Sequence, residues 1–154
     1  MSAGNWDAAY LANTQMSVWP WSDLISYVNK FANDLPGGTN LLELGFGAGA
    51  NLPFFLSLSK LNYYGIEQSE KAFEFVGRKF PAISNQLRCG NITENLFPDL
   101  IFGLVVDRAT LTHNTTSAIL QTLKNLTTCM SPGGIFIGID WFSKSHADSN
   151  LGII

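Results

Sequence analysis

Charged residues are scarce in this chain of 154 residues, at 14% of the sequence, and their net charge is −3. The nine lysines and arginines form no basic block of the kind that marks a nucleic-acid surface. RNA or DNA is therefore disfavoured as a partner, and a small or neutral substrate fits better. Hydrophobic residues reach 46%, which predicts one packed globular domain.

Cysteine and long apolar runs are also in short supply. Cys89 and Cys129 make neither a metal-binding motif nor a disulfide framework, and we expect two buried thiols in a reducing compartment. No other cluster of metal ligands is visible, so no metal site is predicted. No apolar run can span a bilayer, and Trp6, Asp7 and Asn13 interrupt any signal peptide. These absences predict a cytoplasmic protein with no membrane span.

Residues 41–67 are the most informative stretch of the chain. The apolar residues at 41–44 predict a buried parallel strand. A second strand at 63–66 ends at Glu67, where a carboxylate can accept hydrogen bonds from both hydroxyls of a ribose. Glycine tolerates positive φ and lets a ligand lie against bare backbone. The turn between the first strand and the following helix holds three glycines: Gly45, Gly47 and Gly49.

Two classes of cofactor fit this glycine-rich turn. Gly45, Gly47 and Ala50 satisfy the dinucleotide fingerprint G-x-G-x-x-G/A, which favours NAD. The same stretch resembles motif I of the class I S-adenosylmethionine-dependent methyltransferases, E-x-G-x-G-x-G, which Glu43 to Gly49 match in full. Glu43 and the third glycine favour the methyltransferase interpretation. A turn that needs small residues only for packing is the third possibility.

The resemblance to the methyltransferase family continues from about Leu41 to Trp141. Gly90-Asn91-Ile92 is similar to the third motif, with Asn91 in place of the usual aspartate, and an amide oxygen can still accept from an adenine amino group. The strand and loop at 101–114 resemble the fourth motif. The turn Pro132-Gly133-Gly134 before an apolar strand also recurs in the family.

This resemblance implies an α/β fold, a three-layer Rossmann-like sandwich with a mostly parallel sheet in the order 3-2-1-4-5. The family's strands 6 and 7 are lacking, which we interpret as a C-terminal truncation. We divide the single domain into an N-terminal arm and cover helix, 1–35, and an S-adenosylmethionine-binding Rossmann-like domain, 36–154. The predicted strands are 41–44, 63–66, 86–89, 101–107 and 135–139, and the predicted helices are 23–35, 50–58, 69–80 and about 117–130.

The resemblance also implies S-adenosyl-L-methionine as cofactor and S-adenosyl-L-homocysteine as product. From the N-terminal arm, Trp6 and Tyr10 are candidates for a lid, because a sulfonium is attracted to an aromatic face. Packing of the arm onto the domain explains these two residues equally well, and it is the preferred interpretation for Trp19 and Trp21. The cofactor-binding candidates in the domain are Glu43, Gly45, Phe46, Gly47, Gly49, Asn51, Glu67, Gln68, Asn91, Ile92 and Asp107.

A general base is needed if the methyl acceptor is a hydroxyl or an amine. Asp107, His113 and Asp140 follow strand tips, where ligands bind in parallel sheets, and His113 is best matched to neutral pH. A structural role for each of these residues is the alternative, since positioning alone can suffice for methyl transfer.

The sequence therefore predicts a methyltransferase that acts on a small-molecule or saccharide-like acceptor. The alternatives are an inactive cofactor-binding remnant or partner subunit and, less favoured, an NAD-dependent oxidoreductase. Strand 5 would form an apolar sheet edge, and such edges pair with other chains. We therefore expect a homodimer formed through this edge.

Overall fold

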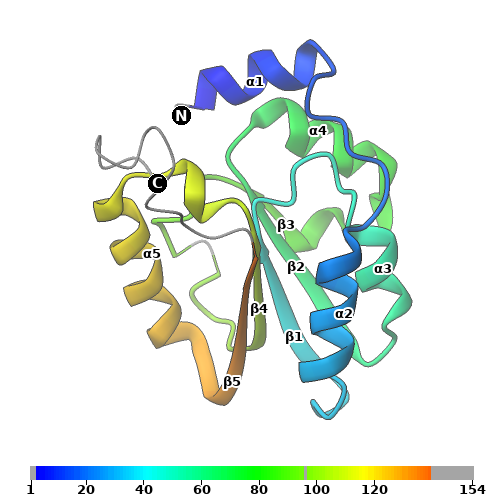
Figure 1. The fold of residues 1–154 in the computed structure, drawn as a ribbon, viewed down its shortest axis with the longest axis vertical. Coiled ribbons are helices and arrows are strands. Elements are labelled where there is room, and N and C mark those ends of the chain that lie inside the picture. The colour runs from blue at the N-terminus through cyan, green and yellow to red at the C-terminus, as the bar shows by residue number, and fades with distance from the viewer. Residues whose placement is uncertain (1–2, 96, 140–154) are drawn as a thin grey trace.

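A single parallel sheet of five strands, in the order β3-β2-β1-β4-β5, organises the computed structural model, which describes residues 3–95 and 97–139 (Figure 1). This is the strand order that the sequence predicts, and the prediction is confirmed. β1 pairs with β2 and β4, β2 pairs with β3, and β4 pairs with β5, all in parallel. The strands are β1 (Thr39–Leu44), β2 (Leu61–Glu67), β3 (Leu87–Cys89), β4 (Phe102–Arg108) and β5 (Met130–Ile139).

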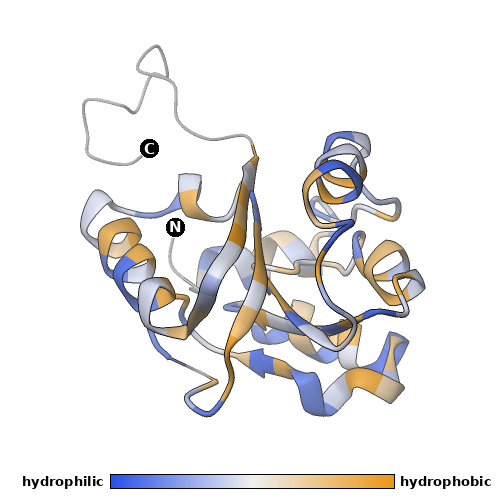
Figure 2. Ribbon diagram, turned by 90° about the horizontal axis from the view of Figure 1, so that it is seen from below, coloured by the Kyte–Doolittle hydropathy of each residue, from blue (hydrophilic) through white to orange (hydrophobic). Residues whose placement is uncertain are grey.

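Helices cover both faces of the sheet, which gives the predicted three layers (Figure 2). α2 (Ser22–Phe31), α3 (Leu52–Ser57) and α4 (Glu70–Lys79) pack on one face around Phe55. α5 (Thr116–Cys129) packs on the other face. Side chains alternate along a strand, so neighbouring residues of β1 belong to the two different cores. Of the helices that the structure describes, none is long and apolar enough to cross a membrane.

Two helices begin where the sequence predicts them. The hydroxyl of Ser69 accepts a hydrogen bond from the backbone N–H of Ala72, and Thr115 accepts from Ala118 in the same way. Each bond satisfies one of the amide donors that have no partner within the helix. These caps fix the start of α4 just after β2 and the start of α5 just after the turn that follows β4.

The N-terminal segment forms a helix, α1 (Ala3–Leu11), that the sequence does not predict. Asp7 attaches it to α4: the carboxylate accepts hydrogen bonds from the Ser69 hydroxyl and from the Lys71 backbone N–H. These bonds hold the pKa of Asp7 below its ordinary value, with the Ser69 bond as the main cause. α1 has almost no apolar periodicity, so a tertiary contact identifies it better than any sequence pattern.

Two expectations about side-chain burial are wrong. Trp19 does not pack the arm onto the domain, because 81% of its surface is exposed. Cys129 is buried, as expected, but Cys89 is exposed at the end of β3. β3 is short and lies at the edge of the sheet, so its last residues have neighbours on one side only.

β5 is longer than the predicted strand at 135–139. It begins at Met130 and includes the Pro132-Gly133-Gly134 segment, where the pairing with β4 shifts register between Phe102 and Leu104. The glycine-rich segment therefore acts as an irregularity within the strand. β5 lies at the sheet edge, and its pairing with a second copy of the chain stays a prediction.

Candidate functional site

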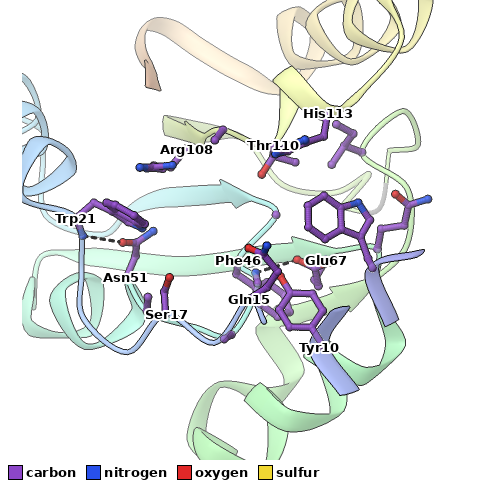
Figure 3. Close-up of a pocket in the computed structure, with 18 of the residues that line it drawn as sticks. Tyr10, Gln15, Ser17, Trp21, Phe46, Asn51, Glu67, Arg108, Thr110 and His113 are labelled. Carbon is purple, nitrogen blue, oxygen red and sulfur yellow. Dashed lines mark hydrogen bonds between the residues drawn. The ribbon is translucent and has the colours of Figure 1, made fainter. Parts of the chain in front are cut away.

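A pocket opens where β1, β2 and β4 end, and α1 and the segment before α2 form its outer wall (Figure 3). In parallel sheets this edge is where ligands bind. Ten of the predicted site residues line the pocket: Trp6, Tyr10, Gly45, Phe46, Gly47, Asn51, Glu67, Gln68, Ile92 and His113.

The turn after β1 depends on glycine for two separate reasons. Gly45 and Gly47 have φ angles of +67° and +53°, a backbone conformation that residues with a side chain rarely adopt. A Cβ atom on Gly45 would lie 2.1 Å from Oγ1 of Thr110, and one on Gly47 would lie 2.8 Å from the Tyr10 hydroxyl. Gly49, with φ of +76°, instead faces Val76 of α4. Gly45 and Gly47 therefore let the pocket lie against backbone, whereas Gly49 permits close packing of a helix.

Glu67 joins the loops that follow β1 and β2. Its Oε2 accepts a hydrogen bond from the Gly47 N–H, and its Oε1 accepts one from the Ser69 N–H, both at 2.8 Å. Burial raises the pKa of Glu67, while these backbone bonds oppose the shift. Each carboxylate oxygen has a second lone pair, so the group can still accept bonds from a ligand. Burial and the nearby Glu67 raise the pKa of Tyr10, which keeps its hydroxyl protonated beside the glycine turn.

Glu43 lies beneath the pocket and does not line it. Its side chain is buried, and it accepts hydrogen bonds from Asn51 Nδ2 at 2.8 Å and from the Tyr63 hydroxyl at 2.6 Å. Burial raises the pKa of Glu43 to about 7, against the opposing effect of these two bonds. Asn51 does line the pocket, and its Oδ1 accepts from the Trp21 N–H at 3.4 Å. Glu43 is therefore a positioning residue for Asn51.

Asp107 does not line the pocket either. It is fully buried, and its Oδ1 accepts hydrogen bonds from the backbone N–H groups of Thr110 and Leu111 at 3.0 and 3.1 Å. The Thr110 hydroxyl in turn donates to the Leu44 carbonyl at 2.8 Å. Asp107 thus shapes the turn after β4 and is not among the residues that line the pocket.

His113 lies in the pocket wall, against the N-terminal helix. Its ring packs edge to face on Trp6, with ring centres 5.1 Å apart and planes at 79°. Asn91 is outside the pocket lining, and its Oδ1 accepts from both the N–H and the hydroxyl of Thr93 at 2.9 Å. Asp140 lies outside the described residues.

Several pocket residues are absent from the sequence-based list of candidates. Arg108 is the last residue of the buried strand β4, a position at which the sequence suggests chemistry, although Arg108 is not among the candidate site residues. Its guanidinium carbon lies 3.7 Å from the centre of the Trp21 ring. Residues before α2 carry no comparable signal, because only the fold brings them to the strand ends. The lining residues outside the list of candidates are Gln15, Ser17, Trp21, Ala48, Ala50, Arg108, Ala109, Thr110 and Asn114.

Comparison with known proteins identifies one family. Residues 42–138 match the family model described as a methyltransferase domain. A search of the curated proteins finds no match.

Solved structures with the same fold include an amino pentose methyltransferase. The amino pentose methyltransferase CalS10 of Micromonospora echinaspora, with S-adenosylmethionine bound, has a TM-score of 0.71 and 20% identity, over 91% of this chain and 59% of that one. DesVI of Streptomyces venezuelae has a TM-score of 0.64 and 21% identity, over 82% and 52%. An S-adenosylmethionine-dependent methyltransferase of Clostridium acetobutylicum has a TM-score of 0.65 and 22% identity, over 80% and 51%. The chain thus spans a little over half the length of these proteins.

Proposed function

The chain belongs to the methyltransferase domain family, and from this we propose that its pocket binds S-adenosylmethionine for methyl transfer to a small-molecule or saccharide-like acceptor. One observation carries the proposal: the positive-φ glycine turn after β1 and the carboxylate of Glu67 at the tip of β2 meet in one pocket. Bare backbone beside an acid at this strand edge suits an adenosyl ligand.

The residues of the pocket fit the parts of such a ligand. The remaining acceptor capacity of Glu67 suits the ribose hydroxyls. Gln68 and Ile92 line the pocket beyond the tip of β2 and would flank the adenine. Trp6 and Tyr10 of α1 would cover the ligand from outside, and an aromatic face near a sulfonium contributes cation–π attraction.

The cofactor would supply an electrophilic methyl group, and the chain would mainly orient the acceptor. Orientation alone can supply several kcal/mol of the barrier reduction. If the acceptor loses a proton, His113 is the proposed base, because it lines the pocket whereas Asp107 accepts backbone bonds inside the protein. The likeness to an amino pentose methyltransferase supports a saccharide-like acceptor.

A calorimetric titration with S-adenosylhomocysteine, with NAD as the parallel ligand, tests the cofactor class. We expect saturable binding of S-adenosylhomocysteine and no heat of binding with NAD. Binding of NAD alone would place the chain among the oxidoreductases. Binding of S-adenosylhomocysteine without methyl transfer to any of a panel of amino sugars and small amines would favour a cofactor-binding subunit instead.

Replacement of Glu67 by alanine should weaken S-adenosylhomocysteine binding by about 1 to 3 kcal/mol, the usual cost of losing a charged hydrogen-bond partner. Calorimetry measures the change, and circular dichroism checks that the variant is folded. Glu74→Ala is the matched control, because Glu74 lies on the exposed side of α4 and forms surface ion pairs with Lys71 and Arg78 of the same helix. If Glu67→Ala binds S-adenosylhomocysteine with unchanged affinity, Glu67 does not contact the ligand and its assignment to the site is wrong.

A further inference from the structure

Arg108 and Trp21 form a stacked pair at one end of the pocket. The guanidinium carbon lies 3.7 Å from the centre of the indole ring, and both residues line the pocket. Figure 3 shows Arg108, Trp21 and Asn51 together at this end, with Glu67 further along and His113 on the wall opposite Glu67. The two ends of the pocket therefore differ in chemistry.

Both members of the pair are held by the fold. Arg108 is the last residue of β4, and the next residue, Ala109, has a φ of +61° and donates its N–H to the Ile139 carbonyl at 3.0 Å. Trp21 donates its backbone N–H to Asn51, whose amide is in turn held by Glu43. A guanidinium that stacks through its face directs its N–H donors outward in the ring plane, where they match the two oxygens of a carboxylate.

The charges along the pocket indicate how a ligand would lie. Among the described residues that line it, Arg108 is the only lysine or arginine. The Glu67 carboxylate can accept hydrogen bonds from neutral hydroxyls of a ligand, but it would repel an anionic group. An anionic group of the same ligand is therefore favoured at the other end of the pocket, beside the positive charge of Arg108. In an adenosyl amino acid, the carboxylate is at the end remote from the adenine.

We propose that Arg108, stacked on Trp21, recognises the carboxylate of the methionine part of the cofactor and selects ligands that carry this group. The inference rests on the proposed function and deepens it. An acceptor could also bring a carboxylate to this end of the pocket, and the experiment below distinguishes the two sources because it contains no acceptor.

The test compares two ligands that differ by one group. S-adenosylhomocysteine carries the carboxylate, and 5′-deoxy-5′-(3-aminopropylthio)adenosine is the same molecule without it. Each is titrated by calorimetry into the wild-type chain, Arg108→Met and Arg108→Lys. Methionine keeps an unbranched apolar stem against Trp21, and lysine keeps the charge without the planar fork. Arg88→Met is the matched control, because Arg88 also stacks on an aromatic ring, Phe97, but does not line the pocket.

In Arg108→Met, the affinity for S-adenosylhomocysteine should fall by about tenfold or more, the usual effect of losing a hydrogen bond to a charged group. The affinity for the analogue should stay within about twofold, and Arg108→Lys should fall between wild type and Arg108→Met. Arg88→Met should bind both ligands as wild type does.

Three results would overturn the inference. An equal loss for both ligands would mean that Arg108 only shapes the pocket. No loss for either ligand would mean that the cofactor's carboxylate is bound elsewhere, which leaves the acceptor as the partner of Arg108. Failure of the wild-type chain to bind S-adenosylhomocysteine would overturn the proposed function as well, and this outcome is distinct from the first two.

Discussion

The chain should be more stable at about pH 5 than at about pH 8, by about 2 to 3 kcal/mol in the free energy of unfolding. The cause is Glu43, whose carboxyl group is buried and has Asn51 and Tyr63 as its hydrogen-bond partners among the residues that the structure describes. Burial raises the pKa of Glu43 from its ordinary value of 4.5 to about 7. Urea unfolding at the two pH values measures the difference.

The sign follows from proton binding. Between about pH 4.5 and about pH 7, folded Glu43 holds a proton that the unfolded chain releases. The folded state binds more protons in this window, so its stability falls as the pH rises and is fully restored below the unfolded pKa. Glu67 contributes in the same direction, because burial also raises its pKa. Asp7 acts in the opposite direction at lower pH, because its pKa is lowered.

Glu43→Gln isolates this effect, since the amide keeps the shape of the side chain but does not titrate. The variant should lose most of the dependence between about pH 5 and pH 8 and keep the smaller part that comes from Glu67. Glu74→Gln serves as the exposed control and should retain the wild-type slope. A wild-type chain that is equally stable at both pH values, or a Glu43→Gln variant with an unchanged slope, would contradict the assignment.

The sheet order could be predicted from the resemblance to the methyltransferase family, and the place of the pocket from the glycine turn and the acid at the ends of two predicted parallel strands. The direction of Glu43 could not be read from its motif. Glu43 lies one residue before the end of β1, which pairs with β2 on one side and β4 on the other. Because side chains alternate along a strand, Glu43 points to the same face of the sheet as Leu41. A side chain in that position enters the helical layer, where its hydrogen bond with Asn51 links it to the pocket lining.

A polar side chain at a strand tip can accept hydrogen bonds from the turn that follows it, or it can face a neighbouring loop and the pocket. The sequence does not show which of these it does. Asn91 and Asp107 both accept hydrogen bonds from backbone N–H groups of the turn that follows them. Glu67 does the same with Ser69, but its second oxygen reaches Gly47 in the neighbouring loop, and this places the carboxylate in the pocket wall. The difference depends on which loop lies alongside, which is a property of the assembled sheet.

The contribution of the N-terminal segment to the pocket could not be predicted from the sequence either. α1 lacks apolar periodicity, yet Trp6 and Tyr10 reach the pocket because Asp7 binds the start of α4. The stacking of Trp21 on Arg108 joins residues 87 positions apart, and no local pattern encodes such a contact.

Replacement of Gly45 by alanine should cost about 2 to 5 kcal/mol of unfolding free energy and abolish S-adenosylhomocysteine binding. Two effects add. A side chain at φ of +67° costs about 1 to 2 kcal/mol, and the new Cβ would lie 2.1 Å from Thr110 Oγ1. Thr110 cannot move aside freely, because its hydroxyl donates to the Leu44 carbonyl and its N–H to Asp107. The β1 turn must therefore shift, and the backbone surface of the pocket shifts with it.

Gly133→Ala separates the two effects, because Gly133 has a similar φ of +75° but no atom near its Cβ position. It should cost only the conformational part, about 1 to 2 kcal/mol. In a Thr110→Ala background the cost of Gly45→Ala should fall, since two neighbouring residues that clash are coupled in a double-mutant cycle. Urea unfolding gives each value. Equal costs for Gly45→Ala and Gly133→Ala, with no coupling to Thr110, would show that the contact between the β1 turn and the β4 turn does not constrain the pocket.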